Sequence, residues 1–427
     1  MSDTGIAEIV ARSRSAQARY ETFGSQARYD RAAQAVAWAI MEPARNRALA
    51  ELAVETTGLG NVADKIIKNH RKTLGLMRDI KGAVTYGVMS DDAATGITEI
   101  ARPKGVIGAI VPSTNPAATP ANNIINALKC GNSIVIAPSP KGVACAEMLL
   151  TYIHAEFAKF GEDPDLVQMI PAPGSKEKTQ ALMEACDMIV ATGSQNNVHR
   201  AQTAGTPAVA VGAGNVTVIV DETADLADAA EKIRASKCFD NATSCSSENA
   251  VVVVDAVYDA FVAAMAGAGG ALVADETAIV SKLWPGGHLN RSVIAQDADK
   301  MIAALDLDVP EGTEYIAVPT AGIGPDHPLS GEKLSRVLAL YRAADFDAAV
   351  QTARAIQLHQ GAGHSVGLHS TDPDRPMTLA NAIPTSRVIV NQAHTLATGG
   401  SFTNGMPFSL SMGCGTWGGN SVNDNVN

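Results

Sequence analysis

The sequence predicts an α/β fold of two doubly wound units with a cleft between them, and three observations support this prediction. Short apolar runs alternate with segments of helical length from residue 104 to residue 221, as in a parallel sheet covered by helices. A second alternation of this kind runs from residue 250 to about residue 392. The chain also has 427 residues, more than a single hydrophobic core usually serves.

The N-terminal region predicts helices followed by a hairpin. Between residues 6 and 77, apolar residues recur with helical spacing among charged residues, which indicates a layer of amphipathic helices. Residues 84–88 and 96–101 then alternate in polarity on either side of an Asp-rich turn, which is typical of a β-hairpin. We expect this hairpin to project from the body and to form a subunit contact.

The strands expected in the first unit lie at residues 106–111, 133–137, 166–170, 187–191 and 216–220. Those of the second unit include residues 250–254, 335–341, 364–369 and 386–391. These boundaries predict a dinucleotide-binding domain of residues 1–83 and 103–220, and a catalytic domain of residues 221–404. We expect the hairpin, 84–102, and the C-terminal segment, 405–427, to serve oligomerisation into a homodimer or homotetramer.

Composition excludes several classes of partner. The formal net charge of −11 argues against nucleic acid or an anionic membrane, because both would repel the average surface. Six cysteines without paired spacing predict free thiols in a reducing compartment, the cytoplasm. We see no secretory signal, no membrane segment and no cluster of residues with metal-ligand spacing, so no metal is expected. The Asn-rich end at Asn427 leads us to expect that the natural chain continues.

One cysteine, Cys245, stands where it can perform chemistry. The small and polar residues around it precede an unbroken apolar run at 250–254, which is typical of a buried strand. A thiol at the mouth of such a strand is approachable, and its thiolate can add to a carbonyl carbon. The alternative is an inert core thiol, which is the better interpretation for four of the other cysteines, in apolar or helical segments: Cys130, Cys145, Cys186 and Cys238.

Strand ends of the first unit carry candidate nucleotide-binding residues. Thr192, Gly193 and Ser194 follow an apolar strand and open a helix, whose free N–H groups can face a pyrophosphate. Ser139 and Lys141 end another strand and can reach an adenosine ribose or its 2′-phosphate. Ordinary caps and turns are the alternative. No G-x-G-x-x-G follows the first strand, so any nucleotide is bound in another way.

A third strand ends in the run Pro112-Ser113-Thr114-Asn115-Pro116. The Asn115 side chain, held between prolines, can direct its amide NH₂ at a developing oxyanion. An Asn before Pro is also an ordinary turn residue, and this interpretation stays open from the motif alone.

Together these segments resemble the aldehyde dehydrogenase superfamily, and more closely its bacterial CoA-acylating branch. The resemblance covers essentially the whole chain and rests on the order and spacing of residues 112–116, 191–193, 211–215, 239–248, 332–335, 361–364 and 413–421. It implies that Cys245 is the nucleophile and that the Asn115 amide and the Cys245 backbone N–H form the oxyanion hole. It also implies that Glu332 lies near the nicotinamide ribose, and that Pro112 and Gly212 belong to the cofactor site.

The chemistry implied for Cys245 is a thiohemiacetal that loses a hydride to a nicotinamide and leaves a thioester. Hydrolytic relatives carry a glutamate base in the loop before the last strand of the cofactor sheet. Residues 207–216, which correspond to that loop, contain no carboxylate, so we expect the CoA thiol rather than water to remove the acyl group. Three alternatives stay open: an acylating enzyme for neutral short aldehydes, a hydrolytic dehydrogenase, and a catalytically silent relative.

The substrate and the nicotinamide are predicted from smaller features. Thr243, Ser244 and Ser246 indicate a polar substrate pocket, and residues 399–402 resemble family members that act on short anionic aldehydes. We therefore expect sulfoacetaldehyde first and succinate semialdehyde second. Ser139 and Lys141, without an acidic neighbour in their turn, slightly favour NADP over NAD. Arg336 stands where relatives usually have proline, so we expect an altered loop near the nicotinamide.

Overall fold

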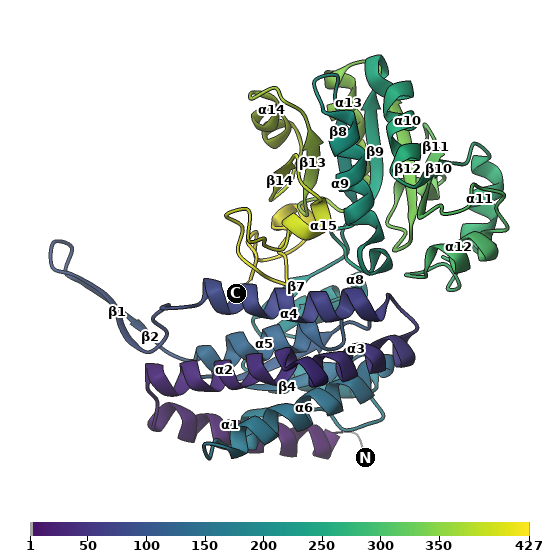
Figure 1. Cartoon of the computed structure of the whole chain (residues 1–427). Helices are drawn as coiled ribbons and strands as arrows, with labels where there is room; N and C mark the ends of the chain where they lie inside the picture. Colours follow the sequence, from purple (N-terminus) through teal and green to yellow (C-terminus); the bar gives the residue numbers. More distant parts are fainter. Residues whose placement is uncertain (1–2, 427) are drawn as a thin grey trace.

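The computed structural model describes residues 3–426 and confirms the α/β fold, with two parallel sheets in separate units (Figure 1). The first unit has a five-stranded sheet in the order β5-β4-β3-β6-β7. Its strands are β3 (Val106–Val111), β4 (Ser133–Pro138), β5 (Val167–Met169), β6 (Met188–Thr192) and β7 (Ala208–Val211). Strands β3 and β4 are buried along their whole length because helices cover both faces.

The predicted N-terminal helices form one layer of this unit. They are α1 (Asp3–Thr22), α2 (Gln26–Met41), α3 (Pro43–Thr57) and α4 (Val62–Asp79). Helix α4 begins at Asn61, whose side chain accepts a hydrogen bond from the Asp64 N–H. The remaining helices of the unit are α5 (Ala118–Lys129), α6 (Val143–Ala158), α7 (Lys176–Ala185) and α8 (Gln195–Thr203).

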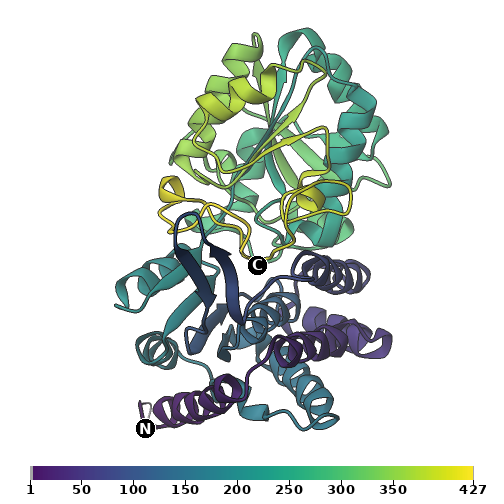
Figure 2. The same ribbon diagram turned by 90° about the vertical axis from the view of Figure 1, so that its left-hand side faces the viewer.

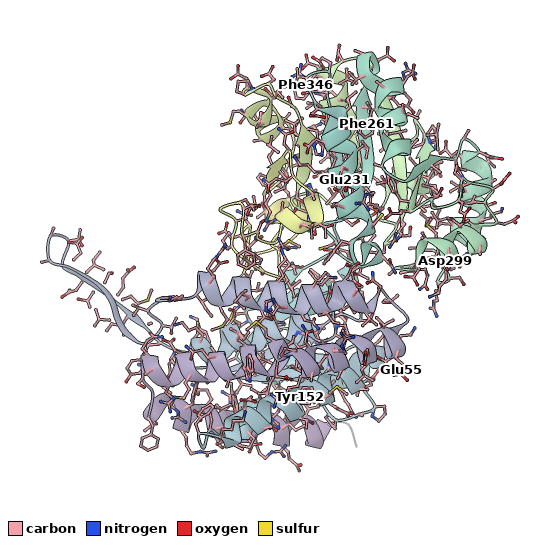
Figure 3. All side chains as sticks on the ribbon, viewed as in Figure 1. Glu55, Tyr152, Glu231, Phe261, Asp299 and Phe346 are labelled. Carbon is pink, nitrogen blue, oxygen red and sulfur yellow. The ribbon has the colours of Figure 1, made fainter. Side chains whose placement is uncertain are left out.

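The second unit has a seven-stranded parallel sheet in the order β10-β11-β12-β9-β8-β13-β14. Its strands are β8 (Val216–Val220), β9 (Glu248–Val254), β10 (Gly270–Leu272), β11 (Tyr315–Pro319), β12 (Val337–Ala343), β13 (Val366–His369) and β14 (Val388–Val390). The helices are α9 (Leu226–Cys238), α10 (Tyr258–Gly267), α11 (Glu276–Leu283), α12 (Ala298–Leu305), α13 (Phe346–His359), α14 (Arg375–Ala382) and α15 (His394–Ala397). Figure 3 labels Phe261 and Phe346, which are buried against this sheet from α10 and α13.

One strand was assigned to the wrong unit. We predicted residues 216–220 as the last strand of the first sheet, but β8 pairs with β9 and β13 in the middle of the second sheet. Strand β7, which we had taken for a loop, closes the first sheet instead. Every residue of β8 is buried, so this strand needs neighbours and helices on both sides, and the centre of the larger sheet supplies them.

The predicted hairpin is confirmed and extends away from the body (Figures 1 and 2). Strands β1 (Gly87–Asp92) and β2 (Ile97–Ala101) pair in antiparallel fashion, and almost all of their residues are exposed. The described part of the C-terminal segment, residues 405–426, lies elsewhere, between the two units. Thr192 in the first unit bonds Ser411, and Arg387 in the second donates to the Gly413 carbonyl. No helix among residues 3–426 is long and apolar enough to cross a membrane.

Candidate active site

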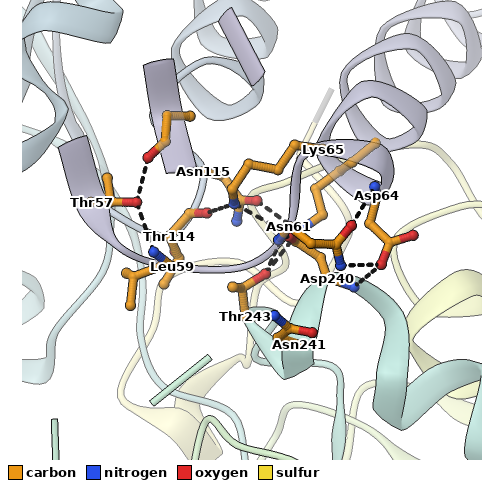
Figure 4. A network of polar contacts seen from close by, with 12 residues as sticks. Thr57, Leu59, Asn61, Asp64, Lys65, Thr114, Asn115, Asp240, Asn241 and Thr243 are labelled. Carbon is orange, nitrogen blue, oxygen red and sulfur yellow. Dashed lines mark hydrogen bonds and ion pairs between the residues drawn. The ribbon is translucent and has the colours of Figure 1, made fainter. Parts of the chain in front are cut away.

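The chain enters the candidate site through a strained segment that α4 holds in place. Asp240, Asn241 and Ala242 all have positive φ, at 47°, 55° and 60°, a conformation that costs free energy at residues other than glycine. The Asp240 carboxylate is fully buried and forms ion pairs with Lys65 and Lys68 of α4 (Figure 4). It also accepts a hydrogen bond from the Asn61 N–H at 3.1 Å. The N-terminal half of α4 thus fixes the backbone before the nucleophile.

Arg336 holds the next residue of this segment. Its guanidinium donates to Asn241 Oδ1 at 3.1 and 2.6 Å, while Asn241 Nδ2 donates to Asp297 Oδ1 at 2.9 Å. Arg336 therefore supports the strained approach to Cys245.

Cys245 lies in the turn that leads into β9, and its sulfur faces a histidine. His364 Nε2 is 3.3 Å from Cys245 Sγ. The other ring nitrogen, His364 Nδ1, is 2.7 Å from Ser365 Oγ. The same hydroxyl lies 2.9 Å from His394 Nε2, so the three side chains form a hydrogen-bonded row. An imidazole at this distance can take the thiol proton, and the row behind it fixes the orientation of the ring.

Both partners of this pair are neutral at rest. Burial raises the pKa of the Cys245 thiol to about 12, and the negative charge of Glu332 adds to the effect. Burial lowers the pKa of His364 to about 3, assisted by the positive charge of Arg387. The thiolate is therefore formed only as the sulfur attacks, with the imidazole accepting the proton at that moment.

The Asn115 amide is oriented by α4. Lys68 Nζ donates to Asn115 Oδ1 at 2.9 Å and to the Thr243 hydroxyl at 2.9 Å. Because an ammonium group only donates, this contact fixes Oδ1 toward the lysine and leaves the NH₂ of Asn115 for another acceptor. In the part of the chain that the structure describes, the Cys245 backbone N–H donates no hydrogen bond either. Two donors are thus available for an oxyanion beside the sulfur.

A glycine-rich cleft is lined by residues of both units. It has an empty volume of about 690 Å³ and is lined by Gln195, Gly212, Ala213, Gln357, Leu358, His359, Gln360, Gly361, Ala362, Cys414, Trp417 and Gly418. Gly214 follows these residues and packs so closely on the Cys245 carbonyl that a Cβ would lie 2.2 Å from that oxygen. The Gly214 N–H also bonds the Glu332 carboxyl, whose pKa burial raises to about 8. Glu332 therefore lies beside the nucleophile, and its contact with a nicotinamide ribose remains a prediction.

The predicted nucleotide residues lie at the ends of strands in the first unit. Ser139 Oγ is buried and has no hydrogen-bond partner among the described residues, so the end of β4 keeps a free hydroxyl for a ribose. Lys141 is exposed beside it and donates to the Thr57 carbonyl at 3.2 Å. Gly193 and Ser194 form the turn into α8, where Ser194 caps the helix. Gly212 lines the glycine-rich cleft, and Pro112 follows β3.

Two of the predicted site residues have hydroxyl groups that already form hydrogen bonds within the chain. Thr192 Oγ1 lies 3.0 Å from Ser411 Oγ of the C-terminal segment, so its hydroxyl serves a contact within the chain. Thr243, which we expected in the substrate pocket, is buried and donates to Asp240 at 2.7 Å. The hydroxyl of Thr243 therefore stabilises the strained segment and does not face the substrate pocket.

Ser244 and Ser246, on either side of Cys245 in the chain, line what we call the cationic pocket. Its lining residues are Lys68, Arg71, Lys72, Asn115, Phe239, Ser244, Ser246, Thr395, Leu410 and Met412. Ser244 and Ser246 thus line a pocket as predicted, and they flank Cys245 in the chain. The carbonyls of residues 399 and 400 face α4, where they accept hydrogen bonds from Lys72 and Arg71.

Sequence reasoning missed the role of His364 and of the α4 cations. His364 was noted only as part of the 361–364 segment, and it meets Cys245 across 119 positions of sequence. Lys65, Lys68 and Lys72 recur with helical spacing, a pattern that ordinarily indicates a solvated face. The placement of these three lysines on one helix face was visible in the sequence. Only the fold shows that this face is buried.

Comparisons with known proteins show the family of this chain. The model of the aldehyde dehydrogenase family matches residues 2–281. A sulfoacetaldehyde dehydrogenase (acylating) of Cupriavidus necator is 57% identical over 99% of this chain and 86% of its own length. The crystal structure of an acetylating aldehyde dehydrogenase from Geobacillus thermoglucosidasius superposes with a TM-score of 0.95 at 30% identity, covering 100% of this chain and 94% of that one.

A further solved structure of a similar protein contains a bound ligand. It is a propionaldehyde dehydrogenase of Rhodopseudomonas palustris with bound CoA and an acylated cysteine. It has a TM-score of 0.85 and is 26% identical over 95% of this chain and 92% of that chain. With its fold, its thiol and these matches, the chain belongs to the aldehyde dehydrogenase family.

Proposed function

We propose that this protein is a CoA-acylating aldehyde dehydrogenase that converts a short anionic aldehyde, CoA and NAD(P)⁺ into an acyl-CoA and NAD(P)H. The setting of Cys245 carries the proposal. Its sulfur lies 3.3 Å from His364 Nε2, and residues 207–216, of which Gly214 packs on its carbonyl, include no carboxylate to activate water.

The first half of the reaction forms a thioester. Cys245 Sγ bonds to the aldehyde carbon while its proton passes to His364, and the carbonyl oxygen becomes an oxyanion. Asn115 NH₂ and the Cys245 N–H stabilise that charge. A bound nicotinamide supplies a hydride acceptor for this carbon. Ser139 and Gly212 are the residues that would hold it, since one offers a buried free hydroxyl and the other lines the glycine-rich cleft.

The second half transfers the acyl group. The thiol of CoA attacks the thioester carbon, and the C–S bond to Cys245 breaks after a second tetrahedral intermediate. His364 first releases to solvent the proton that it took in the first half. It then takes the CoA thiol proton and returns it to the Cys245 sulfur, so no proton is gained or lost in this half. The glycine-rich cleft is the proposed approach, because its lining includes Gly361 and Ala362, which stand just before His364 in the chain.

Sulfoacetaldehyde is the first substrate of the proposal and succinate semialdehyde the second. The cationic pocket beside Cys245 supports an anionic aldehyde, and the relative at 57% identity bears the name of sulfoacetaldehyde. NADP is favoured slightly, since Lys141 is exposed at the end of β4. We further propose that the protein is cytoplasmic, because the cysteines of the described residues are all free. We also propose that it is a homo-oligomer.

A hydrolytic dehydrogenase is the second candidate, and one observation favours it. The Glu332 carboxyl reaches the Gly214 N–H from another part of the chain, with a pKa raised to about 8 by burial. A carboxyl with such a pKa can act as a base toward water near neutral pH.

The deciding experiment measures NADP and NAD reduction with sulfoacetaldehyde, succinate semialdehyde and propionaldehyde, each with and without CoA. Sustained turnover only in the presence of CoA supports the acylating function, and equal turnover without CoA overturns it. In the second case Glu332→Gln should abolish formation of the free acid. Cys245→Ala should abolish turnover in either case, because both reactions pass through the thioester.

A further inference from the structure

Two basic side chains beside the nucleophile have no part in the chemistry described so far. Arg71 and Lys72 follow one another on α4 and line the cationic pocket with Ser244 and Ser246. Both donate hydrogen bonds to backbone carbonyls only. Arg71 Nη2 donates to the carbonyls of residues 396 and 400 at 2.5 and 3.2 Å, and Lys72 Nζ donates to those of residues 399 and 409. Carbonyl oxygens orient these cations but carry no full negative charge.

No acidic residue neutralises them. Other cations of α4 have carboxylate partners: Lys65 and Lys68 share Asp240, and Arg78 pairs with Asp79. Across residues 3–426, neither Arg71 nor Lys72 lies within ion-pair distance of a carboxylate. Burying a charge without a counter-charge is costly. The pKa of Lys72 is accordingly lowered to about 7, first by burial and then by the positive charges of Arg71 and Lys68.

A third group in the same pocket also has no partner. Thr395 lies on α15 and is 5% exposed, and its Oγ1 forms no hydrogen bond with any described residue. Thr395 lines the cationic pocket together with the basic residues of α4. A buried donor left unpaired beside two unneutralised cations is the arrangement expected of a site that awaits an anion with several acceptor oxygens.

We propose that Arg71, Lys72 and Thr395 form the subsite that binds the terminal anion, a sulfonate or carboxylate, of the aldehyde. The inference rests on the proposed function and assigns its substrate selectivity to named residues. Ser244 and Ser246 flank Cys245 in the same pocket, so an aldehyde anchored by its anion at α4 has its carbonyl group near the sulfur. Binding energy from the charged end then serves to position the reacting carbon.

The pocket also has a positively charged approach. Arg71 lines a second, wider hollow with an empty volume of about 1000 Å³, together with Lys232, Asn391, Gln392, Ala393, Leu396, Ala397, Ser401 and Thr403. Arg71 therefore stands where the wider hollow meets the cationic pocket. In a chain of net charge −11, a local positive site of this kind concentrates anionic substrates that the average surface repels.

The test compares two aldehydes in full-length variants. Arg71→Met and Lys72→Met should each lower the ratio of kcat/KM for sulfoacetaldehyde to that for propionaldehyde by about 30-fold or more, because one partner of a buried charge pair is lost. Arg71→Lys should restore part of this ratio. The matched control is Arg78→Met. Arg78 also donates to a carbonyl of the same loop, at Ser401, but it has Asp79 as its partner and lies outside the pocket lining. It should leave the ratio unchanged.

Two kinetic outcomes would overturn the inference. If both aldehydes lose efficiency in parallel, the cations merely hold the loop of residues 396–409. If KM for CoA rises with both aldehydes, the cations serve a CoA phosphate. Neither outcome affects the proposed function, which fails only if wild-type turnover does not depend on CoA.

A second measurement needs no turnover. Ethanesulfonate should slow alkylation of Cys245 by iodoacetamide in the wild type, and propionate should do so if carboxylates fit as well, whereas 1-propanol should not. The protection should disappear in Arg71→Met and persist in Arg78→Met. Absence of protection by both anions in the wild type would overturn the subsite even if the enzyme proves to be acylating.

Discussion

At the scale of single residues, the site keeps its nucleophile neutral until substrate arrives. The Cys245 thiol and the His364 imidazole both have pKa values shifted by burial, to about 12 and about 3, so proton transfer between them is unfavourable at rest. An exposed thiolate invites oxidation, whereas a buried thiol resists it. The oxyanion donors compensate during attack, since they stabilise the charge that the carbonyl oxygen acquires.

This resting state predicts the pH dependence of thiol modification. In the enzyme without ligands, the alkylation rate of Cys245 should rise about tenfold per pH unit between pH 6 and 10, because the thiolate fraction grows in that way below the thiol pKa. Peptide mass spectrometry measures the rate at Cys245 separately from that at Cys130, the exposed cysteine. A rate that stays level down to pH 6 would mean that a thiolate–imidazolium pair exists at rest.

The oxyanion role of Asn115 gives a second prediction. Asn115→Ala should lower kcat by about 10²- to 10³-fold, the usual loss for one oxyanion donor, with a smaller change in KM. Steady-state kinetics with saturating CoA measures it, and unchanged thermal unfolding serves as the control for the fold. If kcat were unaffected while KM rose, the amide would bind the ground state only.

The sequence indicated Cys245 and Asn115 as candidate site residues, but it did not indicate that the His364 imidazole faces the thiol. Cys245 precedes a recognisable strand, and Asn115 stands in a rigid motif at the end of another. His364 comes from a loop before β13, and β13 reaches β9 only through β8, which lies between them. Because the strand order of a parallel sheet is not written in local sequence, the meeting of thiol and imidazole was not predictable.

At the scale of elements, α4 is the scaffold of the site. Its first half holds the strained residues 240–242 through Lys65 and Lys68, and its second half presents Arg71 and Lys72 to the cationic pocket. We predicted this helix from its periodicity, but its basic residues look like a solvated face in sequence. The misplacement of β8 has the same origin: both errors concern which partner an element packs against.

The scaffold role predicts coupling between Lys68 and Asn115. Lys68→Met should lower kcat because the Asn115 amide loses its fixed orientation, and Lys68→Met combined with Asn115→Ala should be little worse than Asn115→Ala alone. A double-mutant cycle on kcat measures this coupling. Fully additive losses would show that Lys68 acts only through Asp240 and the strained segment.

At the scale of the whole molecule, the active site depends on contacts between the two units. Ion pairs from α4 to Asp240 join them on one side of Cys245, and the C-terminal segment joins them on the other. The resemblance of the sequence to a known family predicted this arrangement of two units and a projecting hairpin. The hairpin is the part of it that we expect to contact another subunit.

The hairpin exposes apolar residues that have no partner within the chain. Val88 and Ile100 are cross-strand neighbours, and they are 57% and 60% exposed. A two-stranded ribbon with both edges free and apolar side chains outside is suited to pair with another subunit. We therefore predict that Val88→Lys with Ile100→Lys shifts the protein to a smaller species in sedimentation velocity. Because these side chains are mostly exposed, the subunit itself should keep its fold by circular dichroism.

The turn of the same hairpin supplies a matched control. Ala93→Lys with Ala94→Lys adds the same charge at exposed positions of the turn, outside the paired strands, so this variant should keep the native assembly. If both double variants dissociate, added charge rather than the apolar pair is responsible. If neither does, subunits meet elsewhere and the hairpin has another partner. Dissociation of the first variant alone assigns the contact to the β1–β2 ribbon.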